Sequence, residues 1–452
     1  MIAALESALV SLGLSGPAAN ELAGIFEQVA AALLACGVAR SRCRFLFVPG
    51  RIELLGKHTD YAGGRSLLCA IDHGICLMCA PRPDDVVDIL DVGWREERVF
   101  SLDPALRPPS RDWSNYPMTT ARRVARNFPA ARHGTHIAFR STLPPASGLS
   151  SSSALLTASF LAIAHVNRLE ESPQWSQVTS LEDVAEYLGA VENGQSFRGL
   201  EGDRGVGTFG GSEDHTAMLC CRSGEFSMYS FSPVRRERQV SMPSGHVLAV
   251  AFSGVKAEKT GAAQARYNLA SRAVEVILEQ WRKASGRDDR SLAAAVRSSD
   301  DAPARIREAI ARGNGSPSDG LDADRLLSRF EQFVEESEYI VPRAALALAG
   351  HRLDDFGKFV DRSQHNAERL LGNQVPETVF LARTAREAGA VAASAFGAGF
   401  GGSVWAMLPA PAAPAFLDEL AARYRAAFPH RADAARFFVT APGPAASWLD
   451  TQ

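Results

Sequence analysis

Alternating strand-like and helix-like segments predict an α/β or α+β protein with two lobes. The chain has 452 residues, enough for two domains or three, and its composition of 46% hydrophobic and 22% charged residues is typical of a globular protein. A buried strand is expected at 246–252, so we place the lobe boundary just before it, with lobes at 1–240 and 241–452.

The first half of the chain contains both kinds of segment. The spacing of Leu22, Phe26 and Val29 predicts helices within residues 1–40. The seven glycines of 194–214 have no regular spacing, which predicts an irregular loop. Strands are expected at 44–48, 66–71, 75–80, 88–92 and 135–139, and helices at 155–169 and 180–193.

The second half begins with the continuous apolar run of 246–252, which is typical of a buried strand. Residues 288–320 are polar and rich in Asp, Ser and Gly, and predict a weakly ordered connection with short helices. Helices are expected at 351–371 and 376–389, followed by the glycine cluster 397–402 and a strand at 403–408.

Charge and cysteine content exclude several classes of protein. The net charge is −3, so no global field attracts nucleic acid or an anionic membrane. No signal peptide or apolar run of membrane-spanning length is present. The seven cysteines favour buried free thiols, because a metal site through Cys76 and Cys79 would need two further ligands. We therefore expect a protein of the reducing cytoplasm.

The segment PASGLSSSSALLTASF, residues 145–160, has the features of a phosphate-binding device. Gly148 frees the backbone, and Ser150 to Ser153 supply hydroxyls and amides directly before a long helix. The unpaired N–H groups and the positive dipole end of that helix would attract an anion. One serine is enough to cap a helix, so four in a row favour phosphate binding over capping alone.

A second polar segment, PGRIELLGKHTDYAGG at 49–64, places five ionisable side chains between glycines. A solvated loop is one interpretation, and a pocket that binds a small polar ligand is the other. Buried hydroxyls that lack partners are costly, so a sugar would need such a cluster of polar groups. The five are Arg51, Glu53, Lys57, His58 and Asp60.

Together these segments resemble the three motifs of the GHMP small-molecule kinases. GRIELLGKHTDYAGG resembles the galactokinase signature G-R-x-N-L-I-G-E-H-T-D-Y-x-G-G, Pro144 to Ser152 matches Pro-x-x-x-Gly-Leu-Ser-Ser-Ser, and Gly397 to Gly402 matches Gly-x-Gly-x-Gly-Gly. The resemblance implies an α+β, two-lobed GHMP kinase fold. Its N-terminal lobe would be ribosomal-protein-S5-domain-2-like and its C-terminal lobe ferredoxin-like, with the active site in the cleft between them.

The resemblance implies ATP-dependent phosphorylation of the anomeric (C1) hydroxyl of galactose or a related hexose or hexuronic acid. By the match of GGSED to the family pattern, the catalytic base would be Asp214, and Arg51 would lie beside it. An opposite charge lowers the pKa of an acid, so Arg51 would keep Asp214 ionised. Glu213 is the rival base, and we expect its side chain to point elsewhere.

The nucleotide would lie on the serine segment. The resemblance implies ATP contacts from Trp113, Gly148, Leu149 and the serines Ser150, Ser151, Ser152 and Ser153. It also implies Mg²⁺ binding by Ser152 and a helical glutamate, here Glu192, since this ion prefers hard oxygen ligands. The gap from Glu192 to the base is about ten residues longer than the family pattern, so Glu186 is an alternative.

The sugar would lie beside the base. Matching positions imply substrate contacts from Lys57, His58, Asp60, Gly211 and Tyr267, the last within the segment YNLASR. The expected partners are a small sugar and ATP, with neither nucleic acid nor membrane; the oligomeric state is left open.

Two positions in the first motif depart from the family. The family asparagine is Glu53 and its sugar-binding glutamate is Lys57. An ammonium group donates hydrogen bonds and cannot accept them, so Lys57 either pairs with a uronic acid carboxylate or neutralises Glu53. Two other functions stay open: a non-catalytic sugar and nucleotide sensor, and a non-sugar GHMP kinase.

Overall fold

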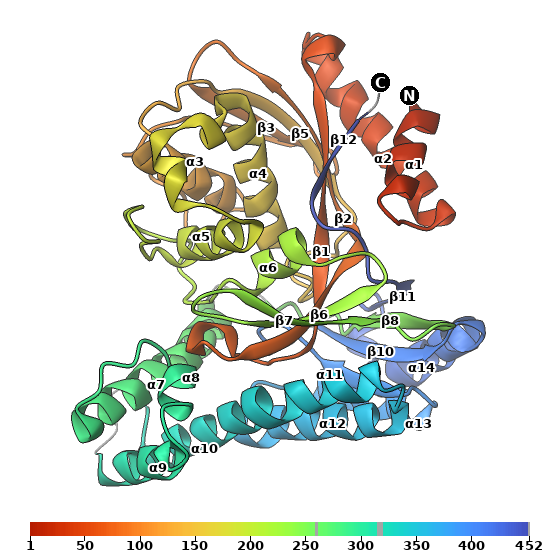
Figure 1. The fold of residues 1–452 in the computed structure, drawn as a ribbon. Coiled ribbons are helices and arrows are strands. Elements are labelled where there is room, and N and C mark those ends of the chain that lie inside the picture. The colour runs from red at the N-terminus through yellow and green to blue at the C-terminus, as the bar shows by residue number, and fades with distance from the viewer. Residues whose placement is uncertain (258–260, 314–319, 451–452) are drawn as a thin grey trace.

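The computed structural model describes residues 1–257, 261–313 and 320–450. Within these ranges the strands form one sheet of eight strands and another of four. Figure 1 shows the long strands β1 (Arg44–Leu55) and β2 (Arg65–Pro81) rising through the first sheet, while β8 (His246–Phe252) and β10 (Ser403–Pro409) of the second run across their lower end. The predicted α+β class with two lobes is confirmed.

The first sheet is built around the long antiparallel pair of β1 and β2. Its strands pair antiparallel except for β3 with β5, which are parallel. The order is β12 (Ser447–Leu449), β1, β2, β5 (Thr135–Ser141), β3 (Val86–Asp91) and β4 (Glu96–Ser101), and β2 also pairs with β6 (Glu225–Ser230), which pairs with β7 (Arg235–Ser241).

Two of the expected strands are one. The segments 66–71 and 75–80 both lie in β2, because Gly74 continues the strand and does not turn it. A Cβ at Gly74 would lie 2.3 Å from the carbonyl oxygen of Val48, so glycine here permits close approach of β1. Strand β1 likewise runs past the expected 44–48 to Leu55, and this places the start of the polar motif on a strand.

Successive residues of β1 face opposite sides of the sheet, and different helices cover each side. Phe45 and Phe47 pack against the first two helices, while Leu46 and Val48 pack against the helix that follows the serine segment. The helices of this lobe are α1 (Ile2–Ser11), α2 (Gly16–Ala35), α3 (Asn115–Asn127), α4 (Ser151–Asn167), α5 (Leu181–Asn193) and α6 (Glu213–Cys220).

The second sheet has the order β11 (Arg436–Thr440), β8, β10 and β9 (Ala392–Ala395). One face packs against α13 (Pro376–Glu387) and α14 (Ala413–Ala427), and the other against α12 (Leu353–Asn366). Trp405 of β10 donates from Nε1 to the carbonyl oxygen of Leu54 at 3.2 Å, which ties the two sheets together. The expected lobe boundary at 240 falls in the last two residues of β7, just before the second sheet begins with β8, although β12 returns to the first sheet.

A block of helices lies beside the polar loop that follows β1 (Figure 1). Much of the segment expected to be weakly ordered packs well: Leu292 and Ile306 are fully buried, in a cluster that also includes Trp281 of the preceding helix and Ala62. Residues 314–319 of that segment lie outside the described residues. The helices are α7 (Gly261–Ser285), α8 (Leu292–Val296), α9 (Ala302–Arg312), α10 (Ala323–Val334), the π-helical turn η6 (Glu335–Ile340) and α11 (Val341–Ala349).

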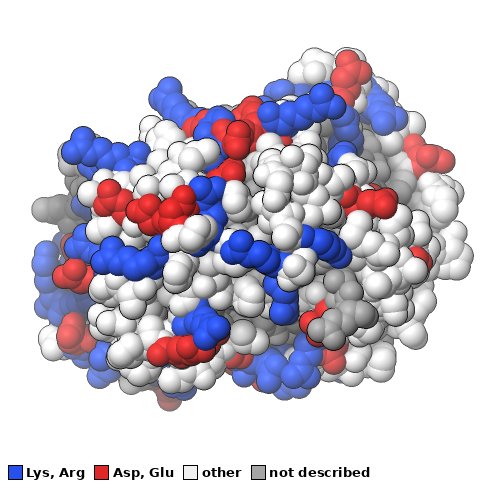
Figure 2. Space-filling model, turned by 90° about the horizontal axis from the view of Figure 1, so that it is seen from above, with Lys and Arg blue, Asp and Glu red and all other residues white. Residues whose placement is uncertain are grey.

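Surface and cysteine features agree with the sequence. All seven cysteines lie in the described ranges and are free thiols. None of the helices described is both long enough and apolar enough to cross a membrane. On the face shown in Figure 2, basic and acidic side chains are interspersed.

Candidate active site

The serine segment forms the turn from β5 into α4. Gly148 has φ +85° and Ser150 has φ +62°, so the backbone turns sharply just before the first helical residue, Ser151. The amino end of α4 therefore opens toward the cavity lined by Ser150, Ser151 and Ser152. Helix N-terminal amides and the helix dipole make such a position favourable for phosphate.

The third glycine cluster lies against this turn. A Cβ at Gly397 would lie only 3.1 Å from the carbonyl oxygen of Gly148, and its φ of +75° also favours glycine. Ser403 Oγ donates to the carbonyl oxygen of Ser147 at 2.7 Å. The two glycine turns, one from each half of the chain, thus meet as the sequence predicts.

The cavity beside the serine turn is lined by both halves of the chain. Trp113 lines this cavity and also a neighbouring cavity, which Phe139 and Leu143 help to line. Leu149 differs from expectation: its side chain is fully buried in the core, and only its carbonyl oxygen is used, accepting from the backbone N–H of Arg51 at 3.3 Å. Arg111 and Lys256 also line the cavity. These two cations could not be selected from the sequence, because no motif contains them.

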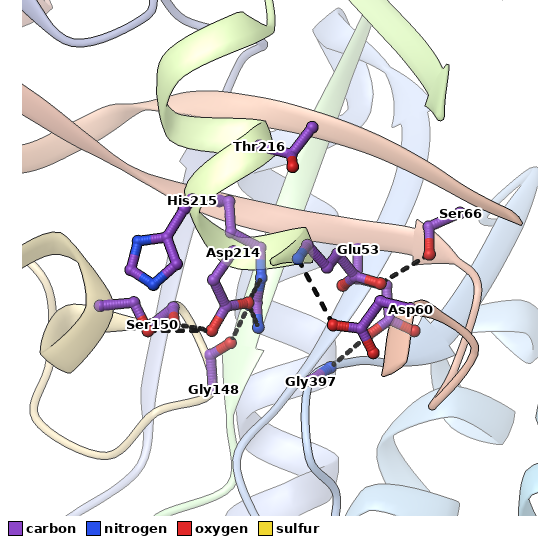
Figure 3. Close-up of polar contacts among 12 residues, drawn as sticks. Glu53, Asp60, Ser66, Gly148, Ser150, Asp214, His215, Thr216 and Gly397 are labelled. Carbon is purple, nitrogen blue, oxygen red and sulfur yellow. Dashed lines mark hydrogen bonds and ion pairs between the residues drawn. The ribbon is translucent and has the colours of Figure 1, made fainter. Parts of the chain in front are cut away.

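Asp214 lies in the first turn of α6 and faces the serine turn (Figure 3). Its Oδ1 accepts from Arg51 Nε at 2.7 Å, and its Oδ2 accepts from the hydroxyls of Ser150 and Ser153. Arg51 is 4% exposed and also donates to the carbonyl oxygen of Gly148. Burial by itself lowers the pKa of Arg51. The negative charges of the adjacent carboxylates, of which Asp214 has the largest effect, more than offset this lowering, so the pKa of Arg51 is raised. Arg51 therefore stays charged beside Asp214.

Glu192, near the end of α5, comes close to Asp214 through a shared serine. Ser153 Oγ lies 2.8 Å from Glu192 Oε2 and 3.1 Å from Asp214 Oδ2. The serine that meets Glu192 is thus Ser153, whereas the sequence favoured Ser152, which lines the adjacent cavity. The alternative, Glu186, accepts from the backbone N–H of Val234 and does not line the cavity of Asp214.

A second cavity adjoins the carboxyl group of Asp214, and four of the five expected sugar contacts line it. His58 contacts the carbonyl oxygen of Ala398 through Nε2 at 3.0 Å and the ring of Tyr267 at 5.1 Å between centroids. Gly211 is required by close packing, since a Cβ there would lie 2.5 Å from Asp60 Oδ2. His58, Asp60, Gly211 and Tyr267 therefore surround one small polar space.

Lys57 does not lie where the motif predicts. It is 1% exposed and is not among the residues that line this second cavity, which we call the sugar-side cavity because the expected sugar contacts line it. Its Nζ donates to Ser363 Oγ at 3.0 Å, and Ser363 donates in turn to Glu336 Oε1 at 2.9 Å. The expected contact between Lys57 and the substrate is therefore not supported, because the ammonium is held by α12 and η6.

Two further glutamates line the sugar-side cavity, Glu53 and Glu213. Glu213 accepts from Ser66 Oγ at 2.6 Å, so its carboxylate points away from the serine turn, as expected for the weaker candidate base. Burial, followed by the charges of Glu53 and Asp60, raises the pKa of Glu213 well above its usual range. Burial likewise raises the pKa of Glu53 to about 7, and Lys57 and Arg51 oppose this rise.

Comparisons with known proteins agree with this arrangement. Family models match at residues 37–81 (galactokinase galactose-binding signature), 115–197 (GHMP kinases N terminal domain) and 344–426 (GHMP kinases C terminal). A galactokinase of Roseiflexus sp. is 26% identical over 83% of this chain and 86% of its own length. A galactokinase of Actinobacillus pleuropneumoniae serotype 5b is 26% identical over 48% of this chain, and the match spans about half, 51%, of that relative.

The fold comparison covers nearly the whole chain. The crystal structure of Lactococcus lactis galactokinase complexed with galactose aligns with a TM-score of 0.74 and 20% identity, over 93% of this chain and 99% of that one. The two-lobed fold and the paired glycine turns are those of the GHMP type, and models of the N- and C-terminal GHMP kinase domains match the chain. Its first motif matches the galactokinase galactose-binding signature, and the chain is similar to a galactokinase along most of its length.

Proposed function

We propose that this protein is an ATP-dependent sugar kinase that phosphorylates the anomeric hydroxyl of galactose or a closely related hexose. The observation that carries the proposal is the position of Asp214 between the two cavities. Asp214 lines the sugar-side cavity and accepts hydrogen bonds from the serine turn, beside which the nucleotide would lie in the other cavity. A phosphoryl group passing between the two ligands would have to pass beside this carboxylate.

In the proposed reaction Asp214 accepts the proton of the anomeric hydroxyl as its oxygen bonds to the γ-phosphorus. The bond from that phosphorus to the β–γ bridging oxygen breaks, and ADP leaves with the electron pair. Arg51, charged and 2.6 Å from Asp214, would stabilise the negative charge on the transferred group. The amino end of α4 would bind the other phosphates.

Magnesium is part of this proposal, and the oxygens near Asp214 suit it. Glu192 and Ser153 place carboxylate and hydroxyl oxygens 2.8 Å apart, and Ser152 lies in the adjacent cavity. Hard oxygens of this kind are the ligands that Mg²⁺ prefers. When bound, the ion would neutralise negative charge on the ATP phosphates. We expect Glu192 and one or both serines to hold it.

Glu192→Gln is expected to raise the Mg²⁺ concentration for half-maximal activity at least about tenfold, since the amide loses the negative charge. Binding of Mn²⁺ in the presence of an ATP analogue, measured by electron paramagnetic resonance, should weaken in parallel. Glu186→Gln is the control and should leave both unchanged. Equal Mn²⁺ affinity in wild type and Glu192→Gln would remove Glu192 from the metal site.

A panel of free sugars with ATP tests the function itself. Galactose and related neutral hexoses should be consumed with production of ADP, and ³¹P NMR should show a sugar 1-phosphate. Phosphate on another carbon, or no transfer to any sugar, would contradict the proposal. The free thiols are consistent with a reducing compartment, so a cytoplasmic location stays part of the proposal.

A further inference from the structure

Relative to the family pattern, this chain has a carboxylate four residues earlier in the first motif and a lysine where the family has its glutamate. The family has asparagine at the position of Glu53 and a sugar-binding glutamate at that of Lys57. In this structure Glu53 lines the sugar-side cavity and Lys57 does not. The cavity thus keeps a carboxylate from this motif, but that carboxylate comes from a different residue.

The carboxylate of Glu53 is fixed on one side and unsatisfied on the other. Glu53 lies on β1 and is 3% exposed. Its Oε2 accepts from the backbone N–H of Gly397 at 3.2 Å, in the glycine turn that also meets Gly148. Its Oε1 is buried and has no hydrogen-bond partner within the described part of the chain. A buried carboxylate oxygen without a donor is costly, and a ligand hydroxyl would supply one.

We propose that Glu53 is the carboxylate that accepts a hydrogen bond from a hydroxyl of the bound hexose, and that it makes the cavity select neutral hexoses against hexuronates. This inference rests on the proposed sugar kinase function. It assigns to position 53 a contact that the family pattern places at position 57.

The charges around the cavity favour a neutral ligand. Five carboxylates line it, and Arg51, which is paired with one of them, is the one Lys or Arg among the lining residues of the described chain. A substrate carboxylate would meet repulsion here and could not reach the Lys57 ammonium, which is held by Ser363. The five are Glu53, Asp60, Glu192, Glu213 and Asp214.

The groups that face Glu53 also set its protonation. Burial raises its pKa to about 7, Lys57 and then Arg51 lower it, and Glu336 and Asp60 raise it. A hydroxyl that donates to Oε1 stabilises the ionised form. Hexose affinity should therefore rise as pH increases through about 7, and this dependence should weaken when the carboxylate is removed.

The test compares wild type with Glu53→Gln, which keeps the size of the side chain. Glutamine has one acceptor oxygen, whereas the site presents two donors, the backbone N–H of Gly397 and the proposed sugar hydroxyl. Binding of D-galactose, measured by calorimetry without ATP, is expected to weaken about tenfold to a hundredfold, as for loss of a hydrogen bond to a charged group. The KM for galactose should rise in parallel, with kcat and the KM for ATP changed less. Glu377→Gln, another buried glutamate, on α13, is the matched control.

Wild type should also bind D-galacturonate at least tenfold more weakly than D-galactose. Thermal unfolding checks that Glu53→Gln is folded. If the folded variant binds galactose within twofold of wild type, the assignment is overturned. A preference of wild type for the uronate would overturn it as well. Glu53→Asn provides a second variant with the family residue and should show the same loss. Because calorimetry reports binding without turnover, a protein that binds hexose in this way but transfers no phosphate would contradict the proposed function alone.

Discussion

Asp214→Asn is expected to lower kcat for sugar phosphorylation by about 10²–10⁴-fold, the range found when a positioned general base is removed. With its amide oxygen in the place of Oδ1, asparagine can still accept from Arg51, and its NH₂ group can donate to the Ser153 hydroxyl that now donates to Oδ2, so the site should keep its shape. It cannot take the proton of the attacking hydroxyl. Initial rates of ADP formation, together with galactose binding by calorimetry, separate the two effects, and the dissociation constant should stay within a few-fold of wild type.

The neighbouring carboxylate provides the matched comparison for this experiment. Glu213→Gln alters a more deeply buried acid in the same helical turn, and its side chain is bonded to Ser66 on β2. It should retain a kcat far above that of Asp214→Asn. If Glu213→Gln abolishes transfer while Asp214→Asn stays active, the roles of the two acids are reversed.

Lys57→Met is expected to lower the free energy of unfolding by about 3–5 kcal/mol, the usual effect of leaving a buried charge without its partner. Methionine fills most of the same space but removes the Lys57 ammonium, which lowers the pKa of Glu53, and the donor to Ser363. Denaturant unfolding at neutral pH measures the difference. Lys358→Met on the exposed side of α12, where the lysine side chain is 76% exposed, should change stability by less than about 0.5 kcal/mol.

The pH dependence of this effect has a definite sign. The pKa of Glu53 is raised in the folded protein to about 7, so the native state holds that proton more tightly than the unfolded state. The stability it contributes is fully present below the ordinary glutamate pKa and is lost as pH rises through about 7. Without Lys57 the pKa of Glu53 should rise further. The deficit of Lys57→Met should thus be larger at pH 8 than at pH 5.5, and an equal deficit at both would contradict the account.

The sequence could predict where the site lies because the motifs act through their own backbone. Glycines and serines at 145–153 and 397–402 determine local turns, and these turns meet as expected. Arg51 and Asp214 were paired through the resemblance, and the structure brings them together. Such features need only the right residues in the right order.

The direction of the Lys57 side chain could not be predicted in this way. Its partner, Ser363, lies 306 residues further along the chain and donates in turn to Glu336, and the packing of α12 and η6 brings these residues near. The same holds for Ser153, whose contact with Glu192 depends on how α4 and α5 pack. The sequence predicts the short helices of 288–313 but not how closely they pack, because polar residues surround their few core positions.

A crystal structure with galactose and a non-hydrolysable ATP analogue would test the central claim most directly. The account predicts a carboxylate oxygen of Asp214 within about 2.6–3.2 Å of the anomeric hydroxyl oxygen, as a general base requires. The γ-phosphate should lie beside Arg51 and point at that same hydroxyl. A sugar whose anomeric carbon faces away from Asp214, or a nucleotide whose γ-phosphate lies outside the cavity of the serine turn, would contradict it.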